Sequence, residues 1–430
     1  MKRLFQLRFL LLASACVLFS TGCDDDDNGT DPNTGPTYPS TPVELMPRPS
    51  LATFGDVTVW HGGYGSGMAL DLTSDEHFYM MTDRGPNFDG ADGDSKVFPI
   101  PSFNPVIGRF KLENGEMNLV SSIVLKDASG TPITGLPNPV GAGGTGETPS
   151  DLDGNILPFD VNGLDPEGIQ FMNDGSFWVS DEYGPYMVHF NAGGTTIERL
   201  SPFSSGRRLP LVLQKRRANR GMEGLAITPD ESKIVGIMQS SLDNPDKSVR
   251  STSKVTRICV FDVATGTSKL FLYEQEAPAL SNSEIRAISN TQFIVLERDG
   301  AFQDAGAVYK RLYKIDISNA TDVLGDDSEN GMMINGKTLE ESTRTEIEAA
   351  GINFVTKSLA FDILSIPGGY PHDKPEGFVI ISSTRIGIIN DDDFGVDDNG
   401  NGGLAQKLLP GTTTTDSNKM YFVTLSTPLF

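Results

Sequence analysis

Acidic side chains recur in one short context along this chain. Each copy opens a brief apolar run, and in all but one copy a glycine follows the glutamate. The four glutamates are Glu167, Glu223, Glu284 and Glu376, separated by 56, 61 and 92 residues. Carboxylates in this number suit Ca²⁺, which takes about six to eight oxygen ligands. The chain has only 4 histidines, and this scarcity disfavours zinc and copper.

We expect a divalent cation, with Ca²⁺ as the first choice, at a site that these repeats form together. Its expected ligands are acids from the starts and ends of the apolar runs: Glu167, Glu223, Glu376, Asp181 and Asp392. The alternative is a structural role. Each Glu-Gly pair would then shape its own repeat, with the glutamate accepting backbone N–H groups from a neighbouring turn.

Arginines accompany the acids. Arg84, Arg298 and Arg385 lie near the ends of apolar runs, and a guanidinium fork matches the oxygens of a phosphoester or carboxylate. We expect Arg84 and Arg298 to bind a small anionic or ester substrate and, with Asp181 and Glu182, to form the catalytic group. Salt bridges to the acids are the alternative role for these arginines. Four further cations cluster in a segment that we expect to be a solvated loop: Lys215, Arg216, Arg217 and Arg220.

Several catalytic signatures are absent from the sequence. It has no Gly-x-Ser-x-Gly elbow, no His-Glu-x-x-His, no Cys-x-x-Cys and no phosphate-binding loop. A cation that activates water, with carboxylates as bases, is therefore the more economical chemistry. His61 is the histidine to test as a base. The Asp/Gly-rich runs 89–94 and 397–401 lack the spacing of a calcium-binding EF-hand, so ordinary surface loops are expected there.

The elements that must position these residues are short β-strands. Apolar runs of strand length alternate with Gly, Asp, Asn and Pro clusters, which indicates a sandwich, a barrel or a propeller. The repeat spacing selects the propeller, built from four-stranded antiparallel blades. Five units are legible, and we expect five to seven blades. Pairing of residues 420–425 with residues 57–61 is expected to close the ring, and residues 338–350 are expected to form a short surface helix.

A propeller would bring the acids together. The first strand of each blade lines the central channel, and the second strand runs back antiparallel to it. The start of the first strand and the end of the second therefore meet at one mouth of the channel. The sequence predicts a ring of carboxylates and amides at that mouth, with a few arginines among them.

The N-terminus has the pattern of an export signal. Basic residues come first, residues 10–19 are almost entirely apolar, and small residues precede Cys23. We expect residues 1–22 to be a lipoprotein signal peptide and Cys23 to be acylated; Cys16 is a weaker candidate, and secretion without a lipid is the alternative. Residues 23–49 are expected to be a flexible tether, and residues 50–430 the propeller domain. The expected location is the outer membrane or cell surface, otherwise the periplasm or the medium.

Charge and cysteine content limit the partners. The formal net charge is −23, which argues against nucleic acid because phosphate backbones need a basic surface. We expect a monomer that touches the membrane only through its lipid. Cys259 lies in an apolar run, so a buried core position is expected for it and not a disulfide or a nucleophile.

Four motifs together resemble the phytase-like domain family, also described as esterase-like activity of phytase. They are residues 165–168 followed by 178–185, residues 219–226, residues 83–87 and residues 390–395, and they occur in the family's order. The resemblance covers roughly residues 50–427. It implies a propeller and the hydrolysis of esters or phosphoesters. The alternative is a non-catalytic surface propeller that binds a glycan, a peptide or a partner protein.

Overall fold

Short antiparallel strands make up almost every regular element of the chain, as the spacing of its turn residues predicts. The computed structural model describes residues 36–93, 95–144 and 146–430. Residues 1–22 and Cys23, the expected signal peptide and acylation site, lie outside the described residues. One compact unit runs from Tyr38 to Phe430. Within the described part of the chain, no helix is long and apolar enough to cross a bilayer.

Three separate sheets each contain four antiparallel strands. The first consists of β11 (Pro166–Phe171), β12 (Phe177–Asp181), β13 (Tyr186–Phe190) and β14 (Thr196–Leu200). The second consists of β15 (Met222–Ile227), β16 (Lys233–Met238), β17 (Val255–Asp262) and β18 (Ser268–Glu274). The third consists of β19 (Ser281–Ala287), β20 (Gln292–Arg298), β21 (Lys310–Asp316) and β24 (Thr356–Asp362). Each sheet has the composition expected of one propeller blade.

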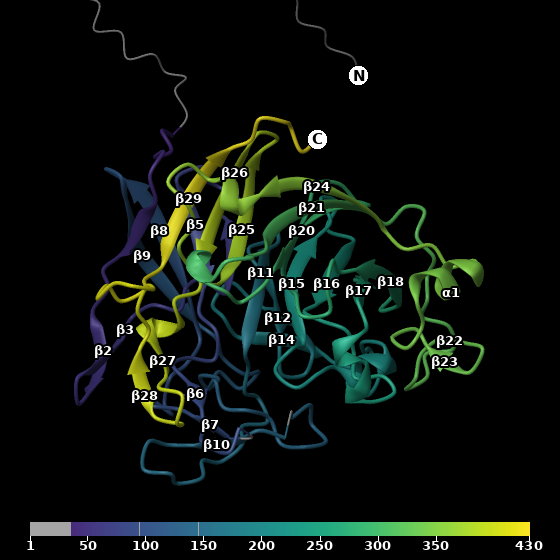
Figure 1. The fold of residues 1–430 in the computed structure, drawn as a ribbon, viewed down its shortest axis with the longest axis horizontal. Coiled ribbons are helices and arrows are strands. Elements are labelled where there is room, and N and C mark those ends of the chain that lie inside the picture. Colours follow the sequence, from purple (N-terminus) through teal and green to yellow (C-terminus); the bar gives the residue numbers. More distant parts are fainter. Residues whose placement is uncertain (1–35, 94, 145) are drawn as a thin grey trace, which may run out of the picture. The chain divides into compact units, whose positions relative to one another are not determined.

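An eight-stranded sheet supplies two further blades. One contains β4 (Gly67–Leu70), β5 (His77–Met81), β8 (Val106–Glu113) and β9 (Glu116–Val124). The other contains β25 (Pro375–Ser382), β26 (Arg385–Asn390), β29 (Lys419–Thr424) and β1 (Val43–Met46). The two blades join where β1 pairs in parallel with β9. In Figure 1 the yellow strand β29 lies close to the purple N-terminal segment and to β8 and β9.

The five blades form a closed ring. The innermost strands β4, β11, β15, β19 and β25 contact one another in that order, and β25 contacts β4 again. The fold is therefore a propeller, as predicted, and its five blades correspond to the five units that the sequence shows. The prediction of the closing pair was wrong. Strand β29 pairs with β1, whereas β3 (Val57–Trp60) forms a hairpin with β2 (Ser50–Phe54).

The propeller domain begins earlier in the chain than residue 50, where the sequence analysis placed its start. Val43–Met46 is an integral strand of the last blade, and the compact unit begins at Tyr38. The expected boundary between residues 49 and 50 therefore falls inside the propeller. Hydrogen bonding to β29 fixes β1 in place, and local composition gives little sign of that pairing.

Several small elements lie outside the blades. A three-stranded sheet is formed by β6 (Phe88–Asp89), β7 (Ser95–Val97) and β10 (Thr148–Ser150), and two hairpins are formed by β27 (Val396–Asp398) with β28 (Leu404–Gln406) and β22 (Met333–Ile334) with β23 (Lys337–Thr338). The helix expected over 338–350 is present as α1 (Arg344–Ala349). It starts late because Thr343 forms a capping box with Glu346.

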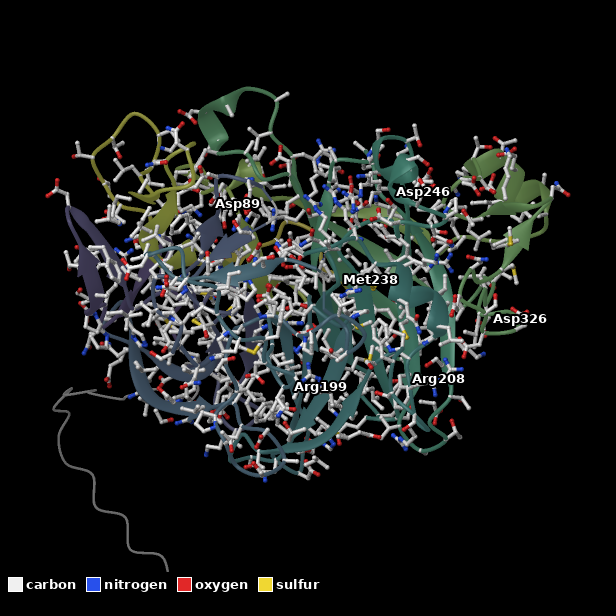
Figure 2. All side chains as sticks on the ribbon, turned by 90° about the horizontal axis from the view of Figure 1, so that it is seen from below. Asp89, Arg199, Arg208, Met238, Asp246 and Asp326 are labelled. Carbon is white, nitrogen blue, oxygen red and sulfur yellow. The ribbon has the colours of Figure 1, made fainter. Side chains whose placement is uncertain are left out.

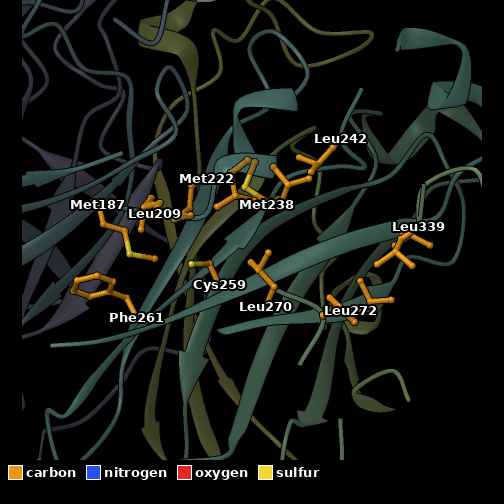
Figure 3. Packing of buried hydrophobic residues seen from close by; sticks show 14 of the residues in the cluster. Met187, Leu209, Met222, Met238, Leu242, Cys259, Phe261, Leu270, Leu272 and Leu339 are labelled. Atoms are coloured by element: carbon orange, nitrogen blue, oxygen red, sulfur yellow. The ribbon is translucent and has the colours of Figure 1, made fainter. Parts of the chain in front are cut away.

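Apolar side chains pack between neighbouring blades. Cys259 lies among Met222, Met238 and Leu270 in one such cluster (Figure 3). Burial raises the pKa of its thiol to about 12, so Cys259 is a core residue, as predicted, and not a nucleophile.

The central channel is occupied by a single buried guanidinium. Arg286 donates to the backbone carbonyls of Leu225, Ile285, Phe378 and Met68, which belong to the innermost strands of four blades. Its Nη2 lies 2.5 Å from Glu284 Oε2. One arginine thus ties together strands that are far apart in sequence, and a neighbouring carboxylate balances its charge.

Replacing Arg286 by Met should destabilise the protein by about 3–5 kcal/mol, because Glu284 would keep a buried charge without its partner. Chemical unfolding monitored by circular dichroism measures the change. Arg344→Met is the matched control. Arg344 is also ion-paired, but its side chain is 47% exposed, so a loss of about 0–1 kcal/mol is expected. Equal effects of the two changes would contradict the role assigned to Arg286.

Candidate functional site

A bulge at the start of the innermost strand positions the glutamates. In β11, Pro166 pairs with Asp181 and Gly168 with Ser180, so Glu167 is the extra residue. The same register shift isolates Glu223 in β15 and Glu376 in β25. A bulge turns its extra residue out of the ordinary alternation of a strand. Three glutamates from three blades are thereby aimed at one mouth of the channel.

The fourth repeat is shifted by one residue. In β19 the bulge lies between Asn282 and Glu284, so Ser283 occupies the place of the other glutamates. Glu284 takes the position of the glycine, where it accepts backbone N–H groups from Leu225 and Ile285. For Glu284 the structural alternative is therefore the correct interpretation.

The glycine after each bulged glutamate allows close packing of the innermost strands. A Cβ atom on Gly224 would lie 2.6 Å from the Cα of Glu284, and one on Gly168 would lie 2.6 Å from the backbone N of Leu225. Real Cβ atoms do not approach backbone atoms so closely. The Glu-Gly pair thus combines a functional side chain with a contact that only glycine can make.

A cavity of about 330 Å³ lies where the bulged residues converge. Twelve carboxylic residues line it: Asp83, Asp89, Asp165, Glu167, Glu182, Glu223, Asp373, Glu376, Asp391, Asp393, Asp397 and Asp398. Five cationic residues accompany them: Arg84, Lys96, Arg220, Arg298 and Lys374. Figure 2 draws the described side chains and labels Asp89, one of this set. The cavity is strongly acidic even after its cations are counted.

Three of these acids could hold a cation. Asp165, Glu167 and Glu182 each offer an oxygen, and these oxygens lie within 4.8 Å of one another. Asp165 Oδ2 is buried without a hydrogen bond, and Glu167 forms no hydrogen bond or ion pair with any described residue. Glu182 Oε1 accepts from Gln239 Nε2 at 2.7 Å, and the same amide reaches Glu223 Oε2 at 2.8 Å. A donor set made only of carboxylate oxygens fits a hard divalent cation.

Burial and mutual repulsion make these carboxyls hard to ionise. Burial, followed by the charges of Glu223 and Asp165, holds the pKa of Glu167 well above its usual range. The same causes raise the pKa of Glu182. Burial and neighbouring Glu376 raise the pKa of Glu223 to about 8. Without a cation, the site must therefore retain protons that a bound cation would displace.

The structure gathers six of the predicted site residues around this cavity. The predicted ligands Glu167, Glu223 and Glu376 and the predicted catalytic residues Glu182, Arg84 and Arg298 all line it. This arrangement supports their assignment to one site.

Asp181 and Asp392 do not line the cavity, so the geometry does not support their assignment as ligands. It also does not support Asp181 as a catalytic residue. Asp181 accepts backbone N–H groups from Asp165 and Gly184. Asp392 accepts them from Gly63 and Phe394. Each lies one residue from an acid that does line the cavity, namely Glu182 and Asp391. These two aspartates shape turns.

The expected anion-binding arginines are already paired with acids. Arg298 forms an ion pair with Glu376 and donates to Ser283 Oγ at 2.9 Å. The Nε of Arg84 lies 3.4 Å from Asp165 Oδ2. The alternative role, neutralisation of the acids, thus describes both arginines in this state.

The segment 215–220 is not a solvated loop. Arg216 is buried and donates to the backbone carbonyls of Tyr183 and Gly143. Arg220 lines the cavity and donates to Ser281 Oγ at 3.0 Å. Two other candidates lie elsewhere: the ring of His61 contacts the Tyr64 hydroxyl, and Arg385 reaches Thr424 Oγ1.

Sequence reasoning missed several residues of the site, among them Asp165, Lys374, Asp83, Asp373 and Asp393. A signal for the first two was present. Both precede a Pro-Glu-Gly run, so they occupy the same place in two different blades. The Asp/Gly-rich runs also contribute, because Asp89, Asp397 and Asp398 reach the rim of the cavity.

The raised pKa of Glu223 predicts how the free energy of unfolding depends on pH. The pKa of Glu223 rises on folding from its ordinary value of 4.5 to about 8, so the folded protein binds more protons than the unfolded chain between these values. Its stabilising contribution is complete below 4.5 and is lost as the pH rises through about 8. In chelator, the free energy of unfolding should therefore fall by about 1–3 kcal/mol between pH 5 and pH 8.

Urea unfolding with and without Ca²⁺ measures this dependence. Added Ca²⁺ should restore more stability at pH 8 than at pH 5, since fewer protons then compete with it. Glu223→Gln should flatten the slope in chelator. Stability that rises with pH in chelator would contradict the assignment.

Comparisons with known proteins agree with this picture. Residues 59–394 match the family model described as phytase-like, esterase-like activity of phytase. A protein of Arthroderma benhamiae named "uncharacterized secreted protein" is 26% identical over 357 residues, which cover 64% of this chain and 67% of that relative.

Solved structures share only a distant likeness. Hydrazine synthase of Kuenenia stuttgartiensis covers 72% of this chain and 78% of its own at 11% identity, with a TM-score of 0.31. A candidate 6-phosphogluconolactonase of Bacteroides fragilis covers 84% and 87% at 9% identity, with a TM-score of 0.32. At such scores these two likenesses carry no argument. The match to the family model spans most of the propeller, and the chain belongs to the phytase-like family.

Proposed function

We propose that this protein is an exported, cation-dependent hydrolase that acts on phosphoesters or esters at the acidic mouth of its propeller. The observation that carries the proposal is the arrangement of Asp165, Glu167 and Glu182, whose carboxylate oxygens converge in a cavity that also contains guanidinium groups. Family membership and a secreted relative support hydrolysis and export.

The residues fit a divalent cation, and Ca²⁺ is our first choice. Asp165, Glu167 and Glu182 would hold it, with Asp83 and Glu223 close by. A bound cation would supply Lewis acidity toward a phosphoryl or carbonyl oxygen and would lower the pKa of water. The absence of sulfur and imidazole from the described lining residues favours Ca²⁺ or Mg²⁺ over softer metals.

The chain's own side chains have distinct roles in this proposal. Burial and the charge of Glu376 raise the pKa of Glu223 to about 8, and in its ionised form Glu223 is suited to accept a proton from water. Gln239 holds Glu182 and Glu223 in place through its amide group. Arg220 forms no ion pair with any described residue and would orient the anionic part of the substrate. Arg84 and Arg298 could share this role only by leaving their present ion pairs.

A binding module is the second candidate, and one observation favours it. The described residues that line the cavity include no histidine or cysteine, and Ser281 is their only hydroxyl side chain. A cation held at the mouth would then present an anionic glycan, peptide or protein surface to the propeller without turnover.

Assays with aryl phosphates and aryl esters, in Ca²⁺ and in chelator, distinguish the two functions. Turnover should require Ca²⁺, and Glu167→Gln should lower it at least about 100-fold, because the unpartnered ligand is removed. Glu116→Gln, a change at an exposed strand position, is the matched control and should retain full activity. Ca²⁺ binding without turnover on either substrate class would overturn the hydrolase and leave the binding module.

A further inference from the structure

A second pocket adjoins the acidic cavity and has the opposite character. Its volume is about 470 Å³, and it is lined by Arg217, Arg220, Arg250, Ser251, Pro278 and Ala279. Arg220 lines both this pocket and the acidic cavity. The two therefore share a wall. We refer to the second as the arginine pocket.

Two of the three arginines lack a direct ion pair, although carboxylates act on them at longer range: Asp243 on Arg217, and Glu182 and Glu223 on Arg220. Arg250 is neutralised, since its Nε donates to Asp243 Oδ1 at 2.7 Å and its Nη2 to Oδ2 at 2.5 Å. Arg217 and Arg220 form no ion pair with any described residue. The two arginines repel each other: burial, followed by the charge of Arg217, lowers the pKa of Arg220. In a chain of net charge −23, two arginines without a direct ion pair are candidates for binding an external anion.

Local structure holds these arginines in position. Arg220 N donates to Arg217 O at 3.1 Å, and the two residues form an isolated β-bridge. Asn219 lies in the left-handed region with φ of 51° to allow this tight turn. On the other side, Arg250 belongs to the short 3-10 helix η2 (Lys247–Ser251), whose first turn is capped by Asp246. The arginines thus belong to two short, hydrogen-bonded segments, the 217–220 turn and the capped helix η2.

We propose that the arginine pocket binds an oxyanion, a phosphate or carboxylate group, carried by a ligand that also reaches the acidic cavity past Arg220. Guanidinium forks recognise such groups through paired hydrogen bonds. The preferred substrate then carries at least two anionic groups, one in each compartment. Oxyanion binding in the pocket stands by itself, whereas the two-group substrate rests on the proposed hydrolase.

Binding of inorganic phosphate to the full chain in chelator tests the pocket without any turnover. Isothermal titration should detect binding that Arg217→Gln weakens about tenfold or more, since a charge-assisted contact is lost. Arg208→Gln is the control. Arg208 is ion-paired with Asp327, and Figure 2 shows it well apart from Asp246, which caps η2. A parallel titration with acetate shows whether carboxylates share the site.

The results that test oxyanion binding in the pocket differ from those that test the two-group substrate. Absence of phosphate binding to the wild-type chain, or equal binding by Arg217→Gln and the control, overturns the pocket. Unfolding midpoints of the variants must match that of the wild type, and Arg217→Lys, which keeps the charge, should recover part of the affinity.

For the substrate class, an alkanediol bisphosphate in Ca²⁺ should bind at least about tenfold more tightly than phosphate. Glu167→Gln should abolish this advantage and leave phosphate binding intact; no advantage in the wild type overturns the two-group substrate alone.

Discussion

A buried carboxylate can stay ionised only where an opposite charge or hydrogen-bond donors balance it, and this constraint governs the mouth of the propeller. Twelve carboxylic residues meet only five cationic ones in a single cavity. Glu167, near the centre of the acidic group, has no partner among the described residues. The imbalance has to be carried by protons or by a cation. A scaffold built only for stability would have no reason to collect these charges.

The propeller tolerates this imbalance because it separates two layers along its axis. At the mouth, four of the five blades have a bulge in the innermost strand, with Glu at the bulge in three blades and Ser283 in the fourth. Strand β4 of the fifth blade has no register shift. Below it, Arg286 and Glu284 balance each other and bind the innermost strands together. The innermost strands therefore remain tied together where the acids above them repel one another.

The sequence pattern predicted the propeller and the convergence of Glu167, Glu223 and Glu376, because repeated Glu-Gly pairs and strand-length apolar runs are visible locally. It did not predict register. Asp181, Glu284 and Asp392 each lie one residue from the functional position, since hydrogen-bond pairing between strands decides which side chain faces the mouth. Strand β1 was not predicted for a related reason, because its partner β29 lies at the other end of the chain.

The acidic cavity and the arginine pocket depend on each other electrostatically. An anion approaching the cavity alone meets a surplus of negative charge, so it gains little there until a cation has neutralised Asp165, Glu167 and Glu182. The arginine pocket can bind an anion before any cation occupies the acidic cavity. Arg220 lines both compartments and connects them. A ligand with one anionic group can satisfy only one compartment. A ligand with two can be held by Arg217 while its second group meets the cation, and this geometry favours extended polyanions over simple esters.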